Sequence, residues 1–140
     1  MSMALLVYSG NSLKSTSDPL PWQCLTRYPS AISNVTFIDI DYKDLMVKKR
    51  SVVQATSQLN SMFTNIEYPD GDVLLRSDQY IQLGCDLRDL NHLQKTLSSV
   101  LNVERCAILF TAEVSITYMD VESADALIRW AGTMPDGMSF

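Results

Sequence analysis

Hydrophobic and polar positions follow two patterns along this chain. Short continuous apolar runs are typical of strands covered on both faces of a sheet. These runs predict four strands, at 4–8, 35–40, 80–85 and 106–112. Between them, apolar residues recur three, four and seven positions apart, which is the spacing of an amphipathic helix. That spacing predicts four helices, which begin near residues 18, 42, 90 and 120.

The clearest helix follows the third strand, where the apolar residues are Leu90, Leu93, Leu97, Val100 and Leu101. Asp18 and Asp120 each stand where a helix N-cap is expected. The segment 65–79 is loop-like, with a turn at 69–72 and a short extended piece at 73–75. Strands and helices therefore alternate four times, which predicts an α/β fold with a parallel sheet and right-handed crossovers.

Length and composition limit the class of protein. A chain of 140 residues that is 46% hydrophobic can bury one core, and we expect a single domain. A formal charge of −5 gives no broad attraction for nucleic acid. Apolar runs are too short to span a membrane, and Cys24, Cys85 and Cys106 lack metal-ligand spacing. We expect a cytoplasmic protein with reduced thiols, no bound metal and no membrane contact.

Acidic residues stand at the ends of three predicted strands: Asp41, Asp86 and Glu113. In open α/β sheets, ligands bind outside the carboxyl ends of the strands, and an acid after the second strand commonly accepts hydrogen bonds from ribose hydroxyls. The alternative is that such acids cap the helices that follow them. Capping is the better explanation for Asp39 and Asp89, and both explanations stay open for the three strand-end acids.

Four segments together resemble the leucine carboxyl methyltransferase family, whose enzymes use S-adenosylmethionine. They are Gly84-Cys85-Asp86-Leu87-Arg88-Asp89-Leu90, Ala112-Glu113-Val114-Ser115-Ile116-Thr117-Tyr118-Met119, residues 37–42 and residues 18–23, in the order of the family. The resemblance implies a Rossmann-like class I methyltransferase fold with a mostly parallel sheet. Residues 1–140 would form a partial methyltransferase domain of about four to five strands, without the N-terminal lid and the C-terminal strands of the family.

The resemblance also implies roles for individual residues. Asp41 would bind the ribose of S-adenosylmethionine, and Asp86-Leu87 would bind the adenine. Glu113 would face the methionine portion, above a loop that Gly10 opens. Tyr118 would either border the methyl-transfer site or pack under the following helix. No catalytic residue is assigned, because an ionised carboxylate accepts a methyl group with little acid–base help.

The form of residues 113–119 favours one branch of this family. That branch methylates, and then methoxycarbonylates, the tricyclic guanosine beside the anticodon of phenylalanine tRNA. The first alternative is the branch that methylates the C-terminal leucine of the protein phosphatase 2A catalytic subunit. The second is a non-catalytic remnant, because the loop 11–17 is longer than the family's and lacks its second glycine.

Two further features can be explained as solvated surface positions without a functional role. The basic cluster Lys48-Lys49-Arg50 is either a solvated helix face or a contact to RNA phosphates. His92, the single histidine, falls on the polar side of its helix, and we expect it to be a solvated surface residue without a catalytic role.

Overall fold

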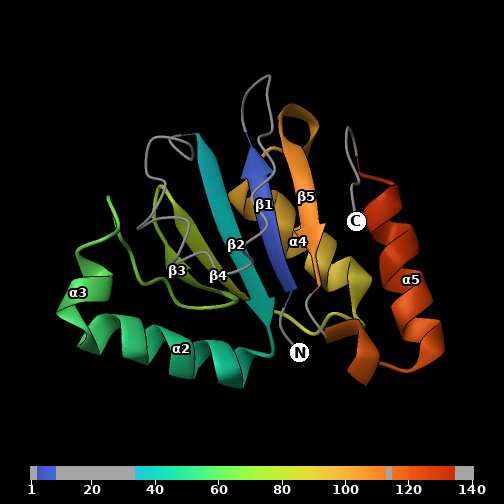
Figure 1. Ribbon diagram of the computed structural model, residues 1–140, viewed down its shortest axis with the longest axis horizontal. Helices are drawn as coiled ribbons and strands as arrows, with labels where there is room; N and C mark the ends of the chain where they lie inside the picture. Colours follow the sequence, from blue (N-terminus) through green and yellow to red (C-terminus); the bar gives the residue numbers. More distant parts are fainter. Residues whose placement is uncertain (1–2, 9–33, 113–114, 135–140) are drawn as a thin grey trace.

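The computed structural model describes residues 3–8, 34–112 and 115–134, which form a sheet with helices on both faces (Figure 1). The sheet has five strands in the order β3-β4-β2-β1-β5. The strands are β1 (Met3–Tyr8), β2 (Val35–Asp41), β3 (Val73–Arg76), β4 (Tyr80–Gly84) and β5 (Ala107–Thr111). The helices are α2 (Lys43–Ala55), α3 (Ser57–Asn60), α4 (Leu90–Val100) and α5 (Val121–Gly132), with 3₁₀ turns η1 (Val103–Arg105) and η2 (Ser115–Tyr118).

The sheet is mixed, and the expectation of a mostly parallel sheet is wrong. Strands β2 and β4 are parallel, whereas β1 is antiparallel to both of its neighbours, β2 and β5. Consequently β2, β4 and β5 run in one direction and β1 runs in the other. A strand covered on both faces has the same apolar pattern in either direction, so the pattern at 4–8 could not reveal this reversal.

Strand β3 adds a second antiparallel edge that the sequence analysis recognised only as an extended piece. It pairs with β4 through a short connection at 77–79, and a tight connection of this kind joins only antiparallel strands. The Ser77 hydroxyl donates to the Tyr80 carbonyl oxygen and accepts from the Tyr80 N–H, both at 2.9 Å, which closes the hairpin. The α/β class holds, but nothing in this topology establishes the methyltransferase fold in particular.

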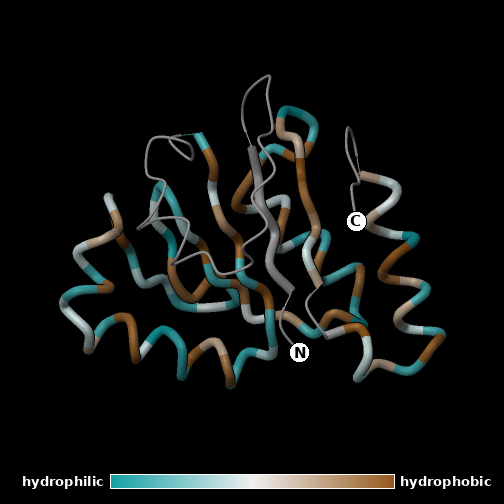
Figure 2. The backbone as a smooth tube through the Cα atoms, viewed as in Figure 1, coloured by the Kyte–Doolittle hydropathy of each residue, from teal (hydrophilic) through white to brown (hydrophobic). Residues whose placement is uncertain are grey.

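Two apolar clusters hold the helices on opposite faces of the sheet. One cluster joins β2, β4 and β5 to α4 and α5 through Ile40, Leu83, Leu97, Phe110 and Leu127. The other joins Phe37, Leu75 and Tyr80 to Val53 of α2 and Phe63. Alternate residues of β2 therefore enter different clusters, as expected for a strand buried on both faces. Figure 2 shows mostly hydrophobic residues along β5 and alternating hydrophobic and hydrophilic stretches along α2 and α5.

The predicted helices are confirmed where the structure describes them. Asp120 caps α5, because its carboxylate accepts the N–H of Ser123 at 2.8 Å. That hydrogen bond also lowers the pKa of the Asp120 carboxyl. The long helix expected from residue 42 to 63 is two helices, since Thr56 adopts an extended backbone between α2 and α3. The helix expected near residue 18 lies outside the described residues.

Candidate functional site

Two of the strand-end acids lie at the same edge of the sheet. Asp41 is the last residue of β2 and stands opposite Gly84, the last residue of the parallel strand β4. The Cys85 N–H donates to the Asp41 carbonyl oxygen at 2.9 Å, which extends this pairing toward Asp86. Strand β5 ends at Thr111 on the same side, because it runs parallel to β2 across β1. We call this side of the sheet the carboxyl edge.

The Asp41 side chain is buried at the carboxyl edge, with 1% of its surface exposed. One carboxylate oxygen, Oδ1, accepts the N–H of Tyr42 at 2.7 Å, just before α2 begins. A carboxylate can accept about four hydrogen bonds, so the same group can hold this N–H together with hydroxyl donors. Because the carboxylate is covered, a ligand could reach it only after its surroundings had moved.

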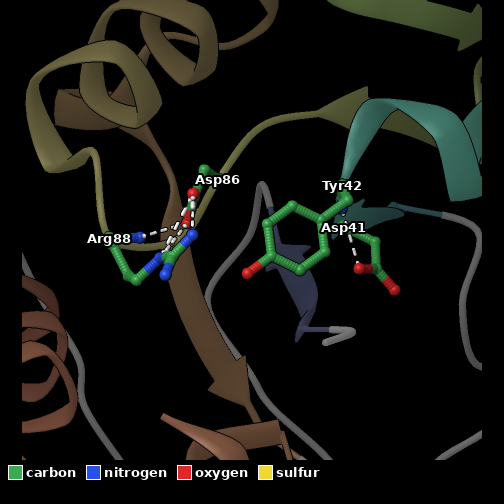
Figure 3. A network of polar contacts seen from close by, with 4 residues as sticks. All are labelled: Asp41, Tyr42, Asp86 and Arg88. Atoms are coloured by element: carbon green, nitrogen blue, oxygen red, sulfur yellow. Dashed lines mark hydrogen bonds and ion pairs between the residues drawn. The ribbon is translucent and has the colours of Figure 1, made fainter. Parts of the chain in front are cut away.

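Asp86 is held by Arg88 in the turn that leads from β4 to α4 (Figure 3). Arg88 Nη2 lies 2.6 Å from Asp86 Oδ2, and Arg88 Nε lies 3.0 Å from Oδ1 and 3.2 Å from Oδ2. The Arg88 backbone N–H also donates to Oδ1, at 3.0 Å. This two-pronged geometry is the strong form of an arginine–carboxylate pair. It occupies much of the hydrogen-bonding capacity of the Asp86 carboxylate.

Tyr42 links the two strand ends. Its ring centroid lies 5.9 Å from Arg88 Cζ, within the range of a cation–π contact. In the view of Figure 3, the ring lies between Asp41 and the Asp86–Arg88 pair, and the Asp41 carboxylate points away from that pair. The structure thus brings the two strand ends together without bringing the two carboxylates into contact.

Tyr42 and Arg88 were not selected by the sequence analysis. The available signal was local: Tyr42 follows a strand-end acid directly, and Arg88 stands two residues after another. An aromatic ring and a cation at such positions are well placed to meet a ligand or each other.

The ion pair also sets the charge state of this turn. Hydrogen bonds from Arg88 lower the pKa of the Asp86 carboxyl, and Asp86 in turn raises the pKa of Arg88. Tyr42 and Asp120 make smaller contributions that also raise the pKa of Arg88. At neutral pH, Asp86 is therefore an anion and Arg88 a cation.

Replacing Arg88 by methionine should raise the pKa of Asp86 toward that of an ordinary carboxyl, because the donors that stabilise the carboxylate are lost. In the unsubstituted protein, the folded-state pKa of Asp86 lies below its unfolded value. The stability that this pair contributes is therefore present above the unfolded pKa and is lost as pH falls through the folded one. Carboxyl-carbon NMR titration of Asp86 in both proteins measures the shift, and an unchanged Asp86 pKa would contradict the assignment.

The remaining predicted site residues differ in how far the structure describes them. Leu87 is buried in the core, so its side chain supports the turn from within. Tyr118 lies in η2 with 74% of its surface exposed, so the alternative that it packs under the following helix is wrong. Gly10 and Glu113 lie outside the described residues, and their roles stay predictions.

Asp39 has a different role from the cap that was expected. Its carboxylate is nearly buried, and Oδ2 accepts from Lys49 Nζ at 2.9 Å and from the Tyr80 hydroxyl at 3.1 Å. Gln82 Nε2 donates to the same hydroxyl at 3.1 Å. Burial, followed by the charge of Asp39, strongly raises the pKa of Tyr80, so the hydroxyl stays protonated. This network ties α2 to β2 and β4. Asp89, in contrast, is confirmed as the cap of α4.

The basic cluster is only partly a solvated face. Lys49 pairs with Asp39, and Arg50 Nη1 lies 3.4 Å from the Pro69 carbonyl oxygen, while Lys48 is exposed. Two of the three cations therefore have structural contacts within the chain, which weakens the case for an RNA contact. His92 is not simply solvated either, because its Nε2 lies 3.3 Å from Asp72 Oδ2.

Two cavities lined by described residues lie away from the carboxyl edge. The larger, of about 700 Å³, lies between the C-terminal ends of α4 and α5 and includes Glu104. The smaller, of about 320 Å³, lies at the amino ends of β2 and β4 and includes Thr36 and Ser77. Neither is lined by Asp41 or Asp86, so the acids and these cavities do not coincide.

Within the described ranges, no group of three or more His, Cys, Asp or Glu side chains is arranged to hold a metal ion. In the same part of the chain, no helix is both long enough and apolar enough to cross a membrane.

Comparison with known proteins supports the resemblance over most of the chain. A protein of Gibberella zeae named tRNA wybutosine-synthesizing protein 4 is 50% identical over 124 residues, which are 86% of this chain and 12% of that protein. Proteins with the same name from Aspergillus fumigatus and Schizosaccharomyces pombe are 40% and 31% identical over 125 residues each, covering 88% and 87% of this chain. This chain is a relative of one segment of tRNA wybutosine-synthesizing protein 4.

That segment is a small part of tRNA wybutosine-synthesizing protein 4. The chain spans 12% of the length of the Gibberella zeae and Aspergillus fumigatus proteins and 18% of the Schizosaccharomyces pombe protein. No family model matches the chain. The three relatives share a name that refers to tRNA, and the protein phosphatase 2A alternative gains no support from them.

Proposed function

We propose that this chain is the cofactor-binding part of an S-adenosylmethionine-dependent methyltransferase of tRNA wybutosine synthesis. The observation that carries the proposal is its similarity, over most of its length, to proteins named tRNA wybutosine-synthesizing protein 4. The acids Asp41 and Asp86 at neighbouring parallel strand ends support it, because ligands of open α/β sheets bind at that edge. The whole enzyme would methylate, and then methoxycarbonylate, the modified guanosine of phenylalanine tRNA in the cytoplasm.

The residues at the carboxyl edge fit a nucleoside cofactor in part. Asp41 offers a carboxylate to the two ribose hydroxyls, and charge-assisted hydrogen bonds of this kind are strong. Asp86 offers a second carboxylate to the adenine, while Leu87 holds the turn in place from the core. To bind the cofactor, the protein would have to expose the buried Asp41 carboxylate. It would also have to release Asp86 from its ion pair with Arg88.

Methyl transfer to a carboxylate requires little general acid or base catalysis. The cofactor, when bound, supplies an electrophilic methyl group on a sulfonium. A substrate carboxyl with a pKa of about 4 is already ionised at neutral pH and can accept that methyl group directly. The contribution of the protein is then to orient the two reactants and to exclude water. Glu113 and Tyr118 are our candidates for residues that border this reaction.

Isothermal titration calorimetry with S-adenosylhomocysteine on the 140-residue chain tests the proposal. We expect saturable heat and a rise in the unfolding temperature, because a ligand that binds only the folded state stabilises it. Guanosine serves as the control ligand and should give neither effect. If S-adenosylhomocysteine at millimolar concentration produces no heat and no thermal shift, the chain is the non-catalytic remnant.

A further inference from the structure

Arg88 contacts two groups of different chemistry at the carboxyl edge, a carboxylate and an aromatic ring. Its guanidinium binds the Asp86 carboxylate through Nε and Nη2, and the same group lies against the ring of Tyr42. A carboxylate that accepts hydrogen bonds and an aromatic face that stacks are the two features that recognise a purine base. Both are already engaged by a side chain of the protein itself.

We infer that Arg88 is a specificity-determining residue that competes with the nucleoside for Asp86 and Tyr42. The guanidinium must move aside before a base can contact either group. This inference rests on the proposed function, because it concerns the same ligand at the same edge. It gives a role to Arg88, a residue to which the proposed function assigns no contact with the cofactor.

The position of Arg88 allows such a movement. Arg88 lies in a turn rather than in a helix, and the side chains of the pair are 50% and 36% exposed. Exposed ion pairs are weak, because water and salt screen them. Asp120 adds a second negative charge near the guanidinium, which favours its present position without burying it. Arg88 is thus held firmly enough to compete with a ligand and loosely enough to be displaced.

The competition favours ligands that replace what Arg88 provides. When a base without a suitable hydrogen-bond donor displaces Arg88, the two-pronged ion pair is lost and the Asp86 carboxylate gains no hydrogen bond in its place. An adenine-type base offers an amino group to Asp86 and a flat surface to Tyr42, so it can replace both contacts. Arg88 therefore lowers the affinity for every nucleoside, and lowers it most for bases without a suitable amino donor.

Calorimetric titration of S-adenosylhomocysteine into the full chain and its Arg88→Met variant tests the inference. Removing the competitor should tighten binding by about two- to fivefold, the range expected from an exposed ion pair. Arg105→Met is the matched control, because Arg105 is exposed in η1 at the start of β5, away from the carboxyl edge. The control should leave the dissociation constant unchanged.

Salt dependence separates competition from a merely structural role. Rising salt screens the Asp86–Arg88 pair, so binding to the unsubstituted chain should tighten relative to binding to Arg88→Met. If Arg88→Met fails to fold, Arg88→Lys retains the charge without the two-pronged geometry and should give a smaller tightening with the same trend.

The outcomes distinguish this inference from the function on which it rests. If the unsubstituted chain binds and the Arg88 variants bind equally or more weakly, the competition is overturned and the proposed function stands. If neither the chain nor any variant binds, both are overturned. If only Arg88→Met binds measurably, the competition is supported and the proposed function of the unsubstituted chain is overturned.

Discussion

Replacing Asp41 by asparagine should weaken the binding of S-adenosylhomocysteine by about 10- to 100-fold, the effect of losing hydrogen bonds to a charged group. Asparagine keeps the shape of the side chain and one carbonyl oxygen that can still accept the Tyr42 N–H. The change therefore removes the negative charge and one acceptor while preserving the start of α2. Calorimetric dissociation constants for the two proteins measure the effect.

Asp125→Asn is the matched control for this substitution. Asp125 is exposed on α5, so its replacement makes the same change in net charge on a different element from Asp41. We expect the control to bind as the unsubstituted chain does. Equal affinities for all three proteins would remove Asp41 from the ligand site and would leave the alternative that it serves only the turn into α2.

Replacing Leu97 by alanine should lower the free energy of unfolding by about 2–5 kcal/mol, the usual cost of truncating a fully buried leucine. Leu97 is completely buried in α4, within the cluster that joins this helix to β2, β4 and β5. Such a loss is a large part of the roughly 5–15 kcal/mol by which most domains are stable. Urea unfolding followed by circular dichroism measures the loss.

Leu45→Ala makes the same chemical change at an exposed position of α2, where 40% of the side chain is accessible. This control should cost less than about 1 kcal/mol, because surface substitutions have small effects. A loss at Leu97 no greater than that at Leu45 would contradict the assignment of α4 to the core.

The described structure separates two kinds of acid that look alike in the sequence. Asp39 and Asp41 are two residues apart in β2, and both point to the face that α2 covers. The Asp39 carboxylate accepts hydrogen bonds from Lys49 and Tyr80 and so holds α2 against the sheet. Asp41 lies at the end of the strand, where the chain turns into α2. Only the second position lies at the carboxyl edge, which is why we propose ligand binding at Asp41.

Several features of this protein could be predicted from local sequence pattern. The apolar runs located β2, β4 and β5 to within one or two residues, and the acids Asp89 and Asp120 marked the starts of α4 and α5. These signals are local because a strand alternates its faces residue by residue and a cap bonds an N–H three residues away. The same signals placed Asp41 and Asp86 at strand ends.

The sequence by itself determined where β1, β2, β4, β5, α2, α4 and α5 begin, and that Asp41 and Asp86 stand at strand ends. Only the tertiary structure decided the direction of β1, the pairing of Asp39 with Lys49 and the engagement of Asp86 by Arg88. The physical reason is that a buried strand looks the same in both directions. An ion pair, likewise, depends on which side chains the folded backbone brings within a few ångströms of each other.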